Sequence, residues 1–133
     1  MIRPVSVLLL ALCLVPAVAA AQAAPSPEQL GVPVYPGSSY DARNSEGMSQ
    51  PTTKYYIFRT ADSLARVVRF YENATKHQGS PLGDRGAVMI VLAGKAPFPT
   101  HGIMIEPNRK GMYPASVRTV ITVIRAVPSP AGH

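Results

Sequence analysis

Few side chains in this sequence have the type and spacing that catalysis requires. Of its three histidines, His77 falls at the end of a predicted helix and His133 in the tail. Only His101 stands next to a predicted strand that carries a carboxylate, Glu106. An imidazole and a carboxylate are the commonest groups for proton transfer. The sequence therefore offers His101 and Glu106 as a candidate polar site and assigns no catalytic residue.

Ligands for a metal or a cofactor are scarce. The chain has no H-E-x-x-H spacing, no G-x-G-x-x-G and no Walker motif. Thioethers can hold Cu(I), and Met48, Met89, Met104 and Met112 follow the N-terminal region. Met89 and Met104 fall within predicted strands, which favours the simpler role of filling gaps in a core. We therefore expect no cofactor and no metal.

Positive charge is the strongest compositional feature, with 13 Lys and Arg against 7 Asp and Glu and a net charge of +6. The candidate basic patch consists of Arg66, Arg69 and Lys76 on a predicted helix, with Arg109 and Lys110 at a predicted hairpin tip. Such charge favours anionic components of the cell envelope. A solvated charged surface is the simpler alternative. Nucleic acid is not expected, because no strand carries the spaced aromatics of a base-stacking surface.

The N-terminal region predicts export. Arg3 precedes an apolar run, Val5 to Val15, and small residues follow it up to Ala21-Gln22-Ala23. These are the three parts of a secretory signal peptide, here residues 1–23, with cleavage near Ala23. The run is too short to span a bilayer comfortably, so we expect no transmembrane helix in the mature chain and a periplasmic or extracellular location.

Cys13 is the one cysteine of the chain and lies inside the apolar run. Leu12 stands where a lipoprotein would have a small residue, which disfavours lipidation. Conventional cleavage removes Cys13 and leaves a mature chain without a thiol.

The mature chain is expected to form one domain, residues 32–127, between a flexible N-terminal linker (24–31) and a tail (128–133). A single helical turn closed by Gly31 could form inside the linker. Strands are expected at 53–60, 86–93, 102–106 and 117–127, with a short strand at 38–44 and a polar loop at 45–52. The convincing helix is 63–77, where Leu64, Val67, Val68 and Tyr71 form an apolar stripe. Asp62 and Ser63 are expected to cap it.

This order predicts an α+β fold: a mostly antiparallel sheet of four to five strands with one main helix on one face (β-β-α-β-β-β). Strands 86–93 and 117–127 are apolar on both alternating faces. One helix covers only one face, so the other needs a cover. The segment 32–40 is the expected cover, and a partner chain or a ligand is the alternative.

Short motifs are spread through the middle of the chain. Tyr35-Pro36-Gly37 forms a "YPG" turn before a predicted strand that ends in Thr60, and Asp62-Ser63 leads into a predicted helix with Phe70-Tyr71. These motifs resemble those of small exported bacterial proteins. The resemblance implies a bacterial exported α+β domain and carries over no functional residue.

The function expected from these observations is a non-enzymatic binding or accessory module of the bacterial envelope, with an anionic component or a protein as partner. A small hydrolase or isomerase with a pocket beside the sheet is one alternative. A structural subunit of a larger envelope assembly is another. A cleft with at least two titratable groups within hydrogen-bond reach would favour the enzyme.

Overall fold

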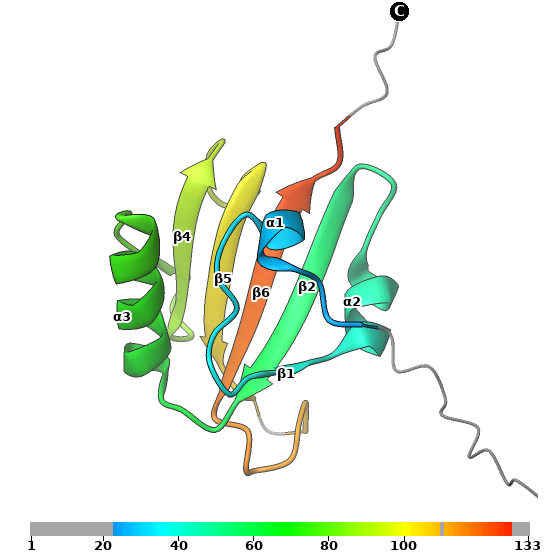
Figure 1. Cartoon of the computed structure of the whole chain (residues 1–133). Coiled ribbons are helices and arrows are strands. Elements are labelled where there is room, and N and C mark those ends of the chain that lie inside the picture. The colour runs from blue at the N-terminus through cyan, green and yellow to red at the C-terminus, as the bar shows by residue number, and fades with distance from the viewer. Residues whose placement is uncertain (1–22, 110, 129–133) are drawn as a thin grey trace, which may run out of the picture.

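The fold is an α+β arrangement built on one six-stranded antiparallel sheet (Figure 1). The computed structural model describes residues 23–109 and 111–128. Most of the predicted signal peptide with Cys13, the basic residue Lys110 and most of the tail lie outside the described residues. The elements in chain order are α1 (Pro27–Leu30), β1 (Ser39–Tyr40), α2 (Ala42–Met48), β2 (Thr53–Thr60), α3 (Leu64–Thr75), β3 (Ser80–Leu82), β4 (Ala87–Ala93), β5 (His101–Pro107) and β6 (Thr119–Ala126).

The sheet has the strand order β1-β2-β6-β5-β4-β3. Its four long strands are the four that the sequence predicts, and the predicted bounds of β2 agree with the structure. The two other strands, β1 and β3, are short edge pieces that raise the count to six. Pro81 within β3 is tolerated because an edge strand needs no donor on its outer side.

The main helix α3 confirms the predicted stripe. Ser63 is its N-cap, with the hydroxyl accepting a hydrogen bond from the Arg66 amide at 3.3 Å. Val67 and Tyr71 are fully buried against the sheet. Asp62 has a different role from capping, because its carboxylate accepts a hydrogen bond from the Tyr35 hydroxyl at 2.5 Å.

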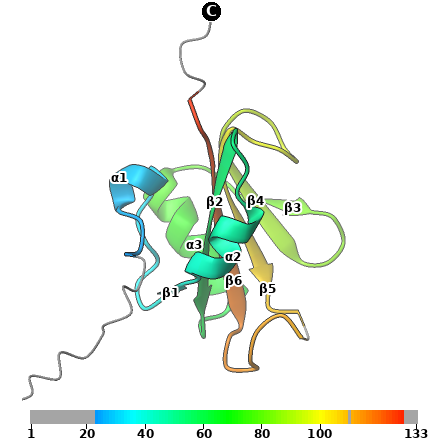
Figure 2. The same cartoon turned by 90° about the vertical axis from the view of Figure 1, so that its right-hand side faces the viewer.

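One face of the sheet, called here the helix-covered face, holds the main core. Figure 2 shows α1 and α3 on the same side of the sheet. The core side chains of the strands come from alternating positions, so they share this face. They are Phe58, Ile90, Ile103, Ile105, Ile121 and Val123.

The segment before β1 packs on this same face, which corrects the prediction that it covers the other one. Leu30, Val32 and Tyr35 join the core cluster, and the Tyr71 hydroxyl donates to the Pro33 carbonyl at 3.0 Å. Residues 27–31 thus belong to the folded unit, although the sequence placed them in a flexible linker. A capping box at Ser26 and a left-handed Gly31 stabilise α1 as the predicted single turn.

The predicted strand 38–44 is wrong for most of its length, and the predicted polar loop 45–52 is wrong for its first half, where a helix continues to Met48. The strand is limited to Ser39–Tyr40, because Asp41 caps α2 by accepting a hydrogen bond from the Asn44 amide at 3.1 Å. The helix then runs to Met48 along the edge of β2 (Figure 2). Within the described residues, no helix is both long and apolar enough to cross a membrane.

Candidate functional site

The predicted polar pair does not come together. His101 and Glu106 lie on β5 five positions apart, and successive residues of a strand point to opposite faces, so an odd spacing separates them. His101 therefore lies on the helix-covered face, where its Nε2 lies 2.9 Å from the Leu30 carbonyl at the end of α1. Burial lowers the pKa of His101, and the charge of Arg125 lowers it further. His101 therefore acts as a neutral donor that anchors α1.

Glu106 lies on the opposite face, called here the groove face. Its carboxylate is 3.7 Å from the Arg109 guanidinium, which follows it by three residues. Arg109 is therefore next to Glu106. Arg66 and Arg69 are instead exposed on α3 at the helix-covered face, and Lys76 is the exposed C-cap of that helix. Arg66 is also 3.9 Å from Asp62. The described members of the predicted basic patch thus do not form one surface.

The groove face is lined by the strand positions that alternate with the core. Register pairs place Ile57 opposite Thr122 and Thr122 opposite Met104, so the floor continues across β2, β6 and β5. None of the helices in the described part of the chain lies flat on this floor. It is bordered by α2 on one side and by the loops 94–100 and 108–118 at its two ends.

Two hollows lie on this face and share Met104. The Phe98 hollow has a volume of about 440 Å³ and is lined mainly by Tyr55, Met89, Pro97, Phe98, Pro99 and Ile124. The methionine hollow has a volume of about 320 Å³ and is lined by Asn44, Met48, Ile57, Met104, Glu106, Met112, Tyr113, Val120 and Thr122. Together they form an apolar groove with one carboxylate in it.

The rim of this groove carries the exposed apolar side chains. Among the described residues, the large hydrophobic side chains that stand out in solvent are Met48 at 48%, Met112 at 49% and Phe98 at 86%. Met48 and Met112 line the methionine hollow, and Phe98 lines the Phe98 hollow. Exposed apolar residues that gather on one face are typical of binding surfaces, whereas single ones scattered over a surface need no explanation.

A buried carboxylate ties two walls of the groove together. Asp41, at the start of α2, accepts hydrogen bonds from the Tyr113 hydroxyl and from the Asn44 side-chain amide at 2.7 Å. Burial raises the pKa of Asp41, but these hydrogen bonds and the Arg59 charge outweigh it and hold the pKa below its usual value. The Arg59 guanidinium also lies 5.4 Å from the centre of the Tyr113 ring. The loop that carries Met112 is thereby fixed to the helix that carries Met48.

The pKa of Tyr113 in this cluster is shifted in the opposite direction from that of Asp41. Burial, together with the hydrogen bond to Asp41, raises the pKa of Tyr113. Asp41 and Tyr113 are two titratable groups within hydrogen-bond reach beside a hollow. Their pKa values both move away from neutrality, whereas a general acid or base works best with a pKa near the working pH. The pair is therefore suited to holding the walls in place.

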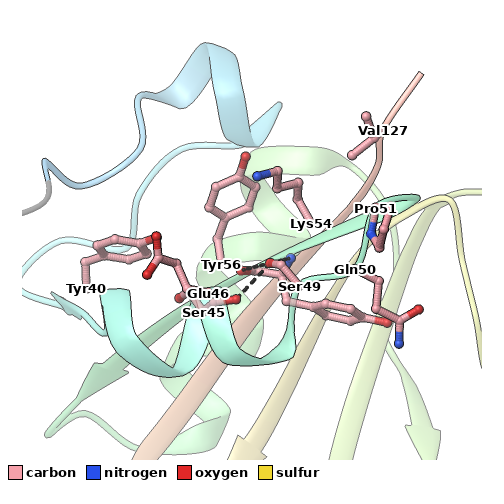
Figure 3. Close-up of a pocket in the computed structure, with 10 residues that line it drawn as sticks. Tyr40, Ser45, Glu46, Ser49, Gln50, Pro51, Lys54, Tyr56 and Val127 are labelled. Atoms are coloured by element: carbon pink, nitrogen blue, oxygen red, sulfur yellow. Dashed lines mark hydrogen bonds between the residues drawn. The ribbon is translucent and has the colours of Figure 1, made fainter. Parts of the chain in front are cut away.

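A third hollow, of about 610 Å³, lies where α2 meets the edge of β2 (Figure 3). The serines of α2 face it and satisfy the strand edge. Ser45 accepts a hydrogen bond from the Ile57 amide at 2.8 Å, and Ser49 accepts one from the Tyr55 amide at 3.0 Å. Glu46, Lys54 and Tyr56 also line it. Its central hydroxyls are thus used to complete the sheet.

Parts of this site could be predicted from the amino-acid pattern. Both faces of strands 86–93 and 117–127 were apolar, which indicated a second buried surface. The walls were missed because α2 starts at a buried Asp41 whose partner, Tyr113, is 72 residues away.

Among the described residues, no three His, Cys, Asp or Glu side chains are grouped to hold a metal ion.

Comparison of the chain with protein-family models, with curated proteins and with solved structures finds no match to any of them.

Proposed function

We propose that this protein is an exported, non-enzymatic binding module of the bacterial envelope, and that its groove binds the apolar chain of an anionic amphiphile such as a fatty acid. The observation that carries the proposal is the clustering of Met48, Phe98 and Met112 around two mainly apolar hollows that share Met104. Each hollow falls in the size range of small-molecule sites, which are mostly apolar with a few polar groups.

Charge at one end of the groove supports an anionic head group. Arg59, Arg109 and Arg118 come from the ends of β2, β5 and β6 that meet beside the 108–118 loop. Two carboxylates, Asp41 and Glu106, lie among them, which leaves an excess of positive charge. An apolar chain in the groove would place a carboxylate or phosphate head within reach of these arginines.

The test uses a dansyl-labelled fatty acid, whose fluorescence rises on entering an apolar site. Phe98→Ser and Met112→Ser are each expected to weaken its binding roughly 5- to 10-fold, since each removes about 1–1.5 kcal/mol of apolar contact. Both residues are exposed, so the fold should survive, which circular dichroism would check. Ala65→Ser, on the exposed surface of α3, is the matched control and should leave affinity unchanged.

A second comparison tests the head group. Arg109→Ala should weaken the labelled fatty acid several-fold at low salt but leave the corresponding neutral alcohol unaffected, because only the charged head gains from the guanidinium. Equal affinities of the wild type, Phe98→Ser and Met112→Ser for the fatty acid would refute the proposal. Recovery of the exported protein in a stable complex with another protein, with no fatty-acid binding, would favour the structural subunit instead.

A further inference from the structure

Three methionines from separate parts of the chain line one hollow of the groove. Met48 ends α2, Met104 lies in β5, and Met112 follows β5 in the 108–118 loop. The hollow that they share has a volume of about 320 Å³. Its walls are held by the hydrogen bonds of Asp41 to Asn44 and Tyr113, so the Met48 and Met112 walls face one another in the folded protein.

Filling gaps in the core explains Met89 but does not explain the two exposed methionines, Met48 and Met112. Met89 is 3% exposed and packs in the neighbouring hollow. Met48 and Met112 are about half exposed. Their side chains therefore contribute little to the packing of the core. What these two share with Met104 is that all three side chains line the same hollow. A role for the sulfur atoms as ligands would account for the three methionines at this hollow.

We propose that Met48, Met104 and Met112 form a thioether site for a soft monovalent cation, Cu(I) or Ag(I). Soft sulfur ligands select such ions over the hard cations that prefer oxygen. The one carboxylate that lines the hollow, Glu106, is already paired with Arg109 at 3.7 Å. The described residues contain no cysteine, so thioethers are their sulfur donors. The site replaces the expectation, from the sequence, that these methionines only fill the core.

The proposed site does not depend on fatty-acid binding, and two kinds of variant separate the two. Met→Leu keeps an apolar side chain of similar volume but removes the sulfur. Met48→Leu and Met112→Leu should therefore lose affinity for the ion, whereas Phe98→Ser, which lies in the other hollow and keeps all three thioethers, should bind the ion as the wild type does. A thioether carries no proton at ordinary pH, so ion binding should stay constant between about pH 5 and pH 8, unlike binding by histidine.

The experiment is a titration with Ag(I) in chloride-free buffer, followed by native mass spectrometry and by NMR of protein with ¹³C-labelled methionine methyl groups. A Cys13→Ser background removes the competing thiol wherever the leader is retained. One ion should bind per chain, and the methyl signals of Met48, Met104 and Met112 should shift. Met112→Leu and Met48→Leu should each weaken binding at least 10-fold, whereas Met89→Leu, the matched control, should not.

The same titration can overturn the proposal. Methyl signals that do not move, or Met48→Leu and Met112→Leu variants that bind Ag(I) as tightly as the wild type, would show that the three thioethers do not form a site. Shifts confined to the rings of His77 or His101 would place the ion elsewhere and would also refute it. Competition with a chromogenic Cu(I) chelator should repeat the result for copper.

Discussion

Asp41 shows how one buried side chain can determine the shape of a binding surface. Its carboxylate caps α2 through the Asn44 amide, and it accepts the hydroxyl of Tyr113 from a distant loop. Hydrogen bonds to a charged group are the stronger kind, and the residue is only 8% exposed. The walls that carry Met48 and Met112 therefore depend on the charge state of a single carboxyl group.

Asp41→Asn should lower the free energy of unfolding by about 1.5–3 kcal/mol at pH 7, the value of hydrogen bonds to a charged partner. The folded-state pKa of Asp41 is lowered, so its stabilisation is present above the unfolded-state pKa and is lost as the pH falls through the folded-state pKa. The difference between variant and wild type should thus shrink below about pH 4, near the unfolded-state pKa. Urea unfolding at pH 7 and at pH 3 measures it, and an equal difference at both would contradict the account.

At the scale of elements, sequence patterns were sufficient to predict those helices and strands whose formation depends on local periodicity and residue type. The periodicity of α3 and the β-branched content of β6 identified both elements. The failures were short elements whose position depends on distant contacts. α2 contains Gly47 and has seven residues, too few for a helix to be stable alone, and is held by serine hydroxyls on the β2 edge. His101 and Glu106 were paired although their odd spacing in a strand places them on opposite faces.

Within α3, truncation costs should follow burial. Val67→Ala should lower the free energy of unfolding by about 2–3 kcal/mol, because the side chain is fully buried against the sheet. Val68→Ala should cost less, since Val68 is half-buried, and Arg66→Ala should stay within about 0.5 kcal/mol. Thermal and urea unfolding of the three variants provide the test, and equal costs at Val67 and Arg66 would mean that the helix faces the sheet differently.

The edge of β2 gives a second prediction at this scale. Ser45→Ala removes the acceptor of the Ile57 amide, which then lies buried without a partner. An unsatisfied buried donor costs about 1–3 kcal/mol, so the variant should unfold at lower urea concentration. It should also associate more readily, because a freed strand edge can pair with another chain. Light scattering before and after mild heating would detect this, and Ser39→Ala, at an exposed position, is the control.

At the scale of the whole molecule, the α+β class and the sheet with a helix on one face could be predicted, because apolar periodicity and the order of elements determine them. Which face of the sheet the N-terminal segment packs on could not be predicted. Leu30, Val32 and Tyr35 supply apolar area that would suit either face, and only the contacts of Tyr35 with Asp62 and Tyr71 with Pro33 select the helix-covered one. The groove exists because this segment packs beside α3.

The pairing of β2 with β6 has a consequence for how the chain folds. Thr53 pairs with Ala126 and Thr60 with Thr119, so the centre of the sheet joins two segments separated by most of the domain. Contacts of such long sequence separation require a large loop to close first and make folding slow. Until the last strand arrives, β2 has only a short partner in β1. A chain with this strand pairing should stay unfolded for longer than a helical bundle of equal length. Slow folding would suit the export that we propose, because an exported polypeptide crosses the membrane before it folds.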